Sequence, residues 1–221
     1  MIVKITKHLL YSLVVLIIIS CGANKKYHDA KSSNSILEYE RYLDKYPESK
    51  YVNQAKEELK TLYEERDWRN STNSNSIALY IDFISKYPNS KYSKQAKQSL
   101  NVLYEERDWN NASRIGFITE YKGFISKYPN SKYAEQARLK IAEIEESNAW
   151  EKSKGLNTIY GYQNFMISYP NSKYGFDARN KIEILKDENA WKDADKIRTV
   201  EAYKSYIAVF PYGTKRVNAL E

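Results

Sequence analysis

The residue types suited to chemistry are few in this chain: one cysteine, two histidines and four recurring pairs of acidic residues. The histidines are His8 and His28, and neither has a cluster of cysteine or carboxylate ligands at zinc-binding spacing. No glycine-rich phosphate loop occurs, and no serine or cysteine has a histidine placed to activate it. The acidic pairs recur with the repeat described below, whereas a glycosidase uses one carboxyl pair across a cleft. They are Glu64-Glu65, Glu105-Glu106, Glu145-Glu146 and Asp187-Glu188. The sequence therefore predicts no enzyme activity, no cofactor, no metal site and no small-molecule substrate.

The only cysteine, Cys21, follows a short apolar segment near the N-terminus. Two lysines precede the apolar run 9–19, which has the length of the hydrophobic part of a signal peptide and is too short to span a bilayer. With Ser20 before it and Gly22 after it, the cysteine resembles the lipobox of bacterial lipoproteins. The resemblance implies that acyl chains such as palmitate are attached to Cys21 and anchor the protein in a membrane. Glycine rather than aspartate after the cysteine favours the outer membrane, with the protein facing the periplasm. The alternative is an uncleaved signal anchor over residues 2–21.

An internal repeat of 41 residues organises the rest of the chain. The ten residues from Phe83 to Tyr92 recur unchanged from Phe124 to Tyr133. Such a period is typical of a solenoid, in which each unit packs against its neighbours rather than around one central core. Every proline and every tryptophan lies on the period: Pro47, Pro88, Pro129, Pro170 and Pro211, and Trp68, Trp109, Trp150 and Trp191.

Each unit predicts a short helix followed by a long one. In the third copy, apolar residues recur at helical spacing from Ile115 to Ile125. This short helix is expected to stop near Tyr128, because the residue before Pro129 is disfavoured in a helix.

Ser131 is the predicted N-cap of the second helix, since its hydroxyl could accept a backbone N–H. This helix is expected to run through Trp150 to about Lys154, which makes it about twice as long as the first. The stretch 155–157 is expected to break it, and Asn157 or Thr158 to cap the next short helix. The tryptophan near its end is expected to pack at the seam with the following repeat rather than to form a ligand platform.

The predicted fold is an all-α solenoid of helical hairpins, tetratricopeptide-like, with four full repeats plus a partial fifth. Residues 1–20 are assigned to a lipoprotein signal peptide, residues 21–34 to a lipidated tether that runs into the first helix, and residues 35–221 to the solenoid. Tyr27 and Ala30 already occupy the tryptophan and alanine positions of the repeat, so helix is expected early. In the fifth copy the second helix is short. Either its first helix caps the array, or the chain is a truncated member of a longer family.

The pattern Tyr-x-x-Phe-Ile-x-x-Tyr-Pro-x-Ser-x-Tyr-x-x-x-Ala, from Tyr121 to Ala137, resembles the repeats of bacterial outer-membrane lipoproteins of the BamD (YfiO) assembly type. The resemblance covers nearly everything after Cys21. It implies a membrane-anchored scaffold for protein–protein interaction in outer-membrane or envelope assembly, with an unidentified protein or peptide as its partner. The alternative is a passive structural spacer or a truncated interaction module of a larger repeat protein. The period of 41 residues exceeds the roughly 34 of tetratricopeptide units, so the long helix gains about two turns.

Charge is the remaining clue to partners. The net charge is +7, and no nucleic-acid-binding motif accompanies it, so nucleic acid is not an expected partner. Lysines flank each turn between short and long helix, about 20 Å along the long helix from the acidic pairs. They are predicted to form a basic edge, opposite an acidic one, that faces anionic lipid or an acidic partner. The alternative is that they serve solubility and form register-fixing salt bridges between neighbouring repeats. The lysines are Lys45, Lys50, Lys86, Lys91, Lys127, Lys132 and Lys173.

Overall fold

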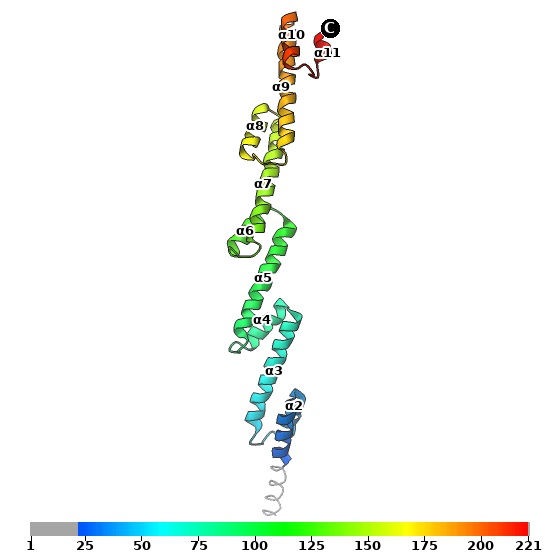
Figure 1. Ribbon diagram of the computed structural model, residues 1–221. Helices are drawn as coiled ribbons and strands as arrows, with labels where there is room; N and C mark the ends of the chain where they lie inside the picture. The colour runs from blue at the N-terminus through cyan, green and yellow to red at the C-terminus, as the bar shows by residue number, and fades with distance from the viewer. Residues whose placement is uncertain (1–21, 221) are drawn as a thin grey trace, which may run out of the picture. The chain divides into compact units, whose positions relative to one another are not determined.

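The computed structural model describes residues 22–220, and this part of the chain contains helices and no strands. Helices of two lengths alternate along it (Figure 1). The short helices are α2 (Ile36–Lys45), α4 (Ile77–Lys86), α6 (Ile118–Lys127), α8 (Ile159–Ser168) and α10 (Val200–Val209). The long helices are α3 (Val52–Ser74), α5 (Ser93–Ile115), α7 (Ala134–Leu156) and α9 (Gly175–Ile197), and α11 (Arg216–Leu220) follows α10. Equivalent helices begin 41 residues apart, which confirms an all-α array of helical hairpins with four full repeats and a partial fifth. None of the helices within residues 22–220 is both long and apolar enough to cross a membrane.

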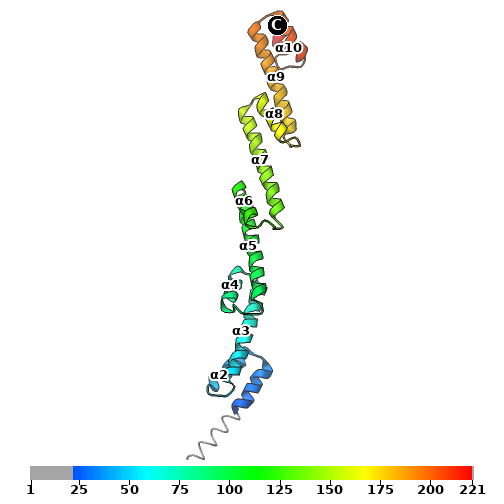
Figure 2. The ribbon, with the colours of Figure 1, turned by 90° about the vertical axis from the view of Figure 1, so that its left-hand side faces the viewer.

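The chain divides into two compact units, one up to Arg107 and the other from Asp108, so the boundary falls inside α5. In the first unit, α3 packs against α2 and α4. In the second unit, α7 packs against α6 and α8, and α9 packs against α8 and α10. Figures 1 and 2 both show α8 beside α7 and α9. A short helix therefore joins two successive long helices by packing against both.

Each short helix ends just before the residue that precedes the proline. In the third repeat α6 ends at Lys127, and Tyr128 leaves the helical region with φ −129° and ψ 66°. Its N–H still donates to the carbonyl oxygen of Phe124 at 2.8 Å. The stop that the sequence predicts near Tyr128 is confirmed, and its cause is the steric effect of Pro129 on the preceding residue.

The serine after the proline binds a backbone N–H, but it is not the N-cap of the long helix. The N-cap of α7 is Tyr133, two residues later. The hydroxyl of Ser131 accepts the N–H of Tyr133 at 3.0 Å, and the carbonyl oxygen of Ser131 accepts the N–H of Ala134 at 3.0 Å. The N-cap prediction was therefore wrong by two residues, because the serine forms a tight turn that leads into the helix. Ser90 and Ser172 make the same hydrogen bond to Tyr92 and Tyr174.

The long helices end at a residue with left-handed backbone. The helix α7 ends at Leu156, and Asn157 follows with φ 46°. Gly155 lies inside the helix, so the break comes from Asn157, a residue type that tolerates this conformation. Thr158 is the N-cap of α8, as predicted, and its hydroxyl accepts the N–H of Gly161 at 3.0 Å. The equivalent positions Asn34, Asn75, Gly116 and Arg198 also have positive φ.

The apolar core consists of a separate cluster at each short helix. In the third repeat, Trp109 from the end of α5 lies against Tyr121 and Phe124 of α6. It stacks on Tyr133, at the start of the next long helix, with ring centroids 5.1 Å apart. Ala137 is completely buried in the same cluster. Trp68 and Trp150 make equivalent contacts in the second and fourth repeats. The prediction that the tryptophans pack at the seams between repeats is confirmed.

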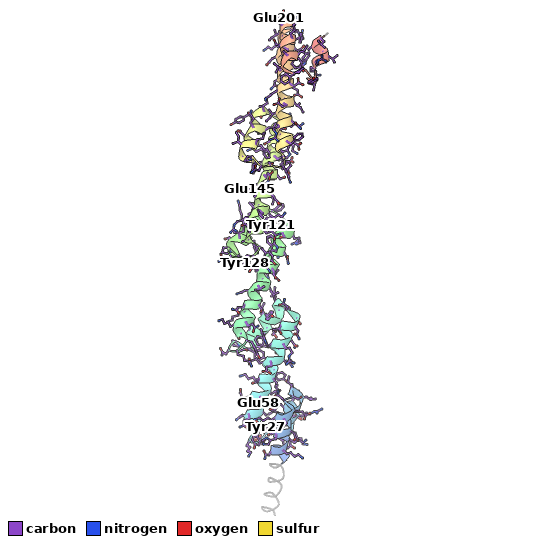
Figure 3. The ribbon with its side chains drawn as sticks, viewed as in Figure 1. Tyr27, Glu58, Tyr121, Tyr128, Glu145 and Glu201 are labelled. Atoms are coloured by element: carbon purple, nitrogen blue, oxygen red, sulfur yellow. The ribbon has the colours of Figure 1, made fainter. Side chains whose placement is uncertain are left out.

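Residues 22–33 form a helix that belongs to the first of these clusters. Tyr27 (Figure 3) occupies the position of the tryptophans and stacks on Tyr51 with ring centroids 4.4 Å apart. Ala30 is buried beside it. This helix is equivalent to the second half of a long helix, so it is part of the array although the sequence assigned it to a tether. Cys21 and the signal segment lie outside the described residues.

Candidate functional site

The seven lysines of the predicted basic edge are exposed and flank the turns between short and long helices. The ammonium group of Lys50 lies 4.8 Å from the centroid of the Tyr51 ring, which is a cation–π contact. Lys91, Lys132 and Lys173 lie in the same way over Tyr92, Tyr133 and Tyr174. Lys45 and Lys127 lie over the tyrosine that ends the short helix.

Three of these lysines also pair with carboxylates of the preceding long helix. Lys91 lies 3.6 Å from Glu65, and Lys86 lies 3.8 Å from Asp67. Lys127 lies 2.6 Å from Asp108. The prediction of a basic edge well separated from an acidic one is therefore wrong. The turn between each short and long helix lies beside the end of the preceding long helix, so Lys86 and Lys127, at the ends of α4 and α6, and Lys91, before α5, face acids from the previous repeat. The alternative, salt bridges between neighbouring repeats, is confirmed at these three lysines; exposed pairs of this kind contribute about 0–1 kcal/mol each.

Both aspartates, Asp67 and Asp108, also accept a hydrogen bond from the tyrosine that directly follows the next short helix. The hydroxyl of Tyr87 donates to Asp67 at 3.0 Å, and that of Tyr128 to Asp108 at 2.9 Å. Burial and this hydrogen bond raise the pKa of Tyr87 to about 12. Burial acts to raise the pKa of Asp67 as well, but hydrogen bonds from Arg66 and Tyr87 outweigh it and keep that pKa below its ordinary value.

The acidic pairs hold the turns of the following repeat. The hydroxyl of Ser90 donates to Glu64 at 2.5 Å, and that of Ser172 donates to Glu146 at 2.5 Å. These carboxylates thus make structural contacts rather than a pair of groups across a cleft. Within residues 22–220, no group of three or more histidine, cysteine or acidic residues is placed to hold a metal ion. His28 makes edge contacts with the rings of Tyr27 and Tyr51, and His8 lies outside the described residues.

The first and fifth copies lack one member of the serine–carboxylate pair, and a tyrosine hydroxyl replaces it. In the first copy Ala23 stands at the acidic position, and the hydroxyl of Tyr42 donates to Ser49 at 2.6 Å. In the fifth copy Gly213 stands at the serine position, and Tyr206 donates to the buried Asp187 at 2.6 Å. The middle copies have phenylalanine at this tyrosine position: Phe83, Phe124 and Phe165. All these contacts join side chains within one repeat or between neighbouring repeats.

An open groove between α8 and α9 is the better candidate for a functional site. Its volume is about 630 Å³. Tyr160 and Ile167 on its α8 side are 72% and 76% exposed. Phe176, which is 66% exposed, lies on α9 one turn before Arg179 and outside the lining of the groove. The groove is lined by Tyr160, Gln163, Asn164, Met166 and Ile167 of α8 and by Arg179, Ile182, Glu183 and Lys186 of α9.

Among the full repeats, only the fourth has large apolar side chains at all three of these positions; in the first repeat Leu37, the counterpart of Tyr160, is also exposed. The helix α8 contains no charged residue. The other repeats therefore serve as internal controls, since the same backbone positions carry smaller or more polar residues. The counterparts of Tyr160 are Leu37, Ala78, Thr119 and Glu201; those of Ile167 are Asp44, Ser85, Ser126 and Ala208; those of Phe176 within full repeats are Asn53, Lys94 and Glu135.

Two other repeats close the equivalent groove with a side-chain pair. Tyr63 donates a hydrogen bond to Glu40 in the first repeat. In the third repeat Lys122 lies 3.9 Å from Glu145. The counterparts in the fourth repeat are Gln163 and Lys186, and Lys186 pairs instead with Glu183 of its own helix at 2.8 Å. The groove between α8 and α9 therefore has no such bridge across it.

The sequence prediction did not include this groove. A signal was present, because residues 159–168 lack charge and Phe176 interrupts a polar position of the repeat. The signal concerns a difference between copies, whereas the repeat was recognised by what the copies share. Comparison with protein families and with curated proteins found no match to this chain.

Proposed function

We propose that this protein is a membrane-anchored envelope lipoprotein that acts as a protein–protein interaction scaffold, with the α8–α9 groove as its binding face. The observation that carries the proposal is the exposure of Tyr160, Ile167 and Phe176 together on one hairpin, since no other full repeat has large apolar side chains at all three positions. Exposed apolar patches rimmed by polar residues are typical of protein-interaction sites. The mode of binding is capture of a segment in the groove between two helices.

The anchor rests on the lipobox-like sequence around Cys21. Gly22, the first described residue, is helical, and a Cβ added there would lie 3.7 Å from the hydroxyl of Tyr46 in the first repeat. A lipid on Cys21 would thus place the first repeat close to the headgroups, without a long spacer. The proposed location is the periplasmic face of the outer membrane. Incorporation of labelled palmitate tests the anchor: the label should be lost in Cys21→Ala, and label that persists in this variant contradicts lipidation at Cys21.

Photo-crosslinking in living cells tests the binding face. A photoreactive phenylalanine analogue is placed at Tyr160, and as a matched control at Ala78, the exposed equivalent in the second repeat. We expect discrete cross-linked protein species from position 160 and none from position 78. A passive spacer predicts no discrete product from either position. Equal products from both positions would show that the groove has no special role.

A further inference from the structure

The side chains along the groove have a symmetric order on each helix. On α9 the outward stripe is Phe176, Arg179, Glu183 and Lys186, with steps of three, four and three residues. On α8 it is Tyr160, Gln163, Asn164 and Ile167, with steps of three, one and three. On each helix, the series of steps is therefore the same whether it is counted from the N-terminal end or from the C-terminal end of the stripe. Two identical helices packed antiparallel about a two-fold axis therefore bring the first and last residues of each stripe together, and likewise the two middle ones.

We infer that the partner of the α8–α9 groove is a second copy of this chain, joined to the first through the same face. Antiparallel pairing of α9 with its counterpart places Arg179 against Glu183 of the other copy, twice in one interface. It also places Phe176 against Lys186, which is a cation–π pair. On α8 the same pairing sets Gln163 against Asn164, whose amides both donate and accept hydrogen bonds. Tyr160 meets Ile167 at both ends. This is an isologous interface, in which one patch is complementary to itself.

The charges of the groove are available for such pairing. Within the described residues Arg179 has no carboxylate partner, and Glu183 has only an exposed contact with Lys186, three residues along its own helix. An exposed pair of this kind is weak and readily exchanged. The apolar ends of both stripes would leave water in the same step, since Tyr160, Ile167 and Phe176 are each more than 60% exposed: 72%, 76% and 66%.

The equivalent stripes of the other repeats are not complementary to themselves. In the first repeat the middle residues are Lys56 and Lys60, which would repel each other. In the third repeat the outer residues are Glu135 and Glu145, which would also repel. The second repeat sets Lys97 against Asn101. Only the fourth repeat among the full ones combines opposite charges with apolar ends, so the fourth repeat alone fits a second copy.

A charge swap tests this inference, which rests on the proposed function because it names the partner of the same groove. The full chain, extracted from bacterial membranes in detergent, is measured by analytical ultracentrifugation. The wild type should form a dimer. Arg179→Glu and Glu183→Arg should each weaken it by about tenfold or more, because each creates two like-charged contacts. The double variant Arg179→Glu/Glu183→Arg should restore it. Arg138→Glu, at the position of Arg179 in the third repeat, is the matched control and should dimerise as the wild type does.

Disulfide trapping gives a second test that does not depend on charge. Asn164 lies next to the inferred axis, so Asn164→Cys should form a covalent dimer on mild oxidation. Gly123→Cys, at the equivalent position of the third repeat, should not; an added Cβ at Gly123 meets no other atom within 4 Å, so that helix tolerates the change. A monomeric wild type, or a double charge variant as monomeric as the single ones, overturns the inference. If the protein is a monomer but position 160 cross-links to a different protein, the scaffold function stands and the second copy is excluded. If position 160 also captures nothing, both fail.

Discussion

At the scale of single residues, tyrosine hydroxyl groups supply hydrogen bonds at the turns of the first and fifth copies, where one member of the serine–carboxylate pair is missing. In the second and fourth repeats a serine of the turn donates a hydrogen bond to a carboxylate, and the short helix has phenylalanine at the position of Tyr42 and Tyr206. Where the acid is missing, Tyr42 binds the serine; where the serine is missing, Tyr206 binds Asp187. A buried polar group left without a partner costs about 1–3 kcal/mol. The hydroxyl therefore adds a hydrogen bond at the two positions where the serine–carboxylate pair is incomplete; Asp187 also accepts two hydrogen bonds from Thr214, and Ser49 accepts one from the N–H of Tyr51.

This exchange predicts coupling between Tyr206 and Gly213. A Cβ on Gly213 would lie 2.4 Å from the hydroxyl oxygen of Tyr206 and 2.6 Å from Asp187, so Gly213→Ser alone should be destabilising. Tyr206→Phe alone should cost about 1 kcal/mol, because Asp187 loses one hydrogen-bond donor. In the double variant the contact with the Tyr206 hydroxyl is gone, and a shift of the Asp187 carboxylate, which lies 2.6 Å from the added Cβ, would let the new hydroxyl donate to it, as serine donates to glutamate in other repeats. Urea denaturation of all four proteins should give a double-variant loss smaller than the sum of the two single losses. Additive losses would contradict the exchange.

A second prediction at this scale concerns high pH. The pKa of Tyr87 is raised from 10.0 to about 12 in the folded protein, first by burial and then by its hydrogen bond to Asp67. A raised pKa contributes stability that is fully present below pH 10 and is lost as the pH rises through about 12. Tyr87→Phe should therefore lower the free energy of unfolding near neutral pH, and its difference from the wild type should shrink between these two values. Tyr169→Phe is the control, since Ala149 replaces the aspartate there. A difference that stays constant up to pH 12 would rule out the link.

Helix boundaries and helix packing, at the scale of elements, differ in how far they follow from the sequence. The stop near Tyr128 and the cap at Thr158 could be predicted, because proline and threonine act on adjacent backbone. The N-cap of the long helix could be predicted only to within one turn, because Ser131 forms a tight turn two residues before the true N-cap, Tyr133. Salt bridges between neighbouring repeats could be predicted as an alternative, but the pairing of Lys91 with Glu65 in particular could not, because it depends on how one long helix meets the next. The α8–α9 groove could not be predicted for a related reason. It is open because Gln163 and Lys186 form no bridge across it, and only the folded hairpin shows that these two positions face each other.

The alanine of each long helix predicts a steric limit on close packing. Ala137 is completely buried between α6 and α7. Ala137→Leu should lower the free energy of unfolding by about 1–3 kcal/mol, because the added carbons have no free volume. Ala142→Leu, on the exposed side of the same helix, should change it by less than about 0.5 kcal/mol. The two are compared by thermal unfolding followed by circular dichroism. Similar effects at both positions would mean that helix propensity, and not packing, controls stability here.

The molecule as a whole has several small cores instead of one, and each is shared by only three consecutive helices. Stability in such an array is close to a sum of terms for each repeat and its nearest neighbours. The period of the sequence was enough to predict this organisation. It was not enough to predict that residues 22–33 supply the half-helix of the first core, since only Tyr27 and Ala30 indicate it.

Because each core is local, a substitution that destabilises one cluster is expected to destabilise only the helices that share this cluster. Trp150→Ala should cost about 3–5 kcal/mol of local stability, because the ring contacts Tyr162, Phe165 and Tyr174. Hydrogen exchange measured by mass spectrometry should accelerate in the second half of α7, in α8 and in the first half of α9. Peptides from α2 and α3 should keep their protection, because they share no core with Trp150. Trp68→Ala should do the reverse, exposing α4 while α8 stays protected. Faster exchange throughout the chain in either variant would show that the repeats unfold as one unit, and the nearest-neighbour account of this array would then be wrong.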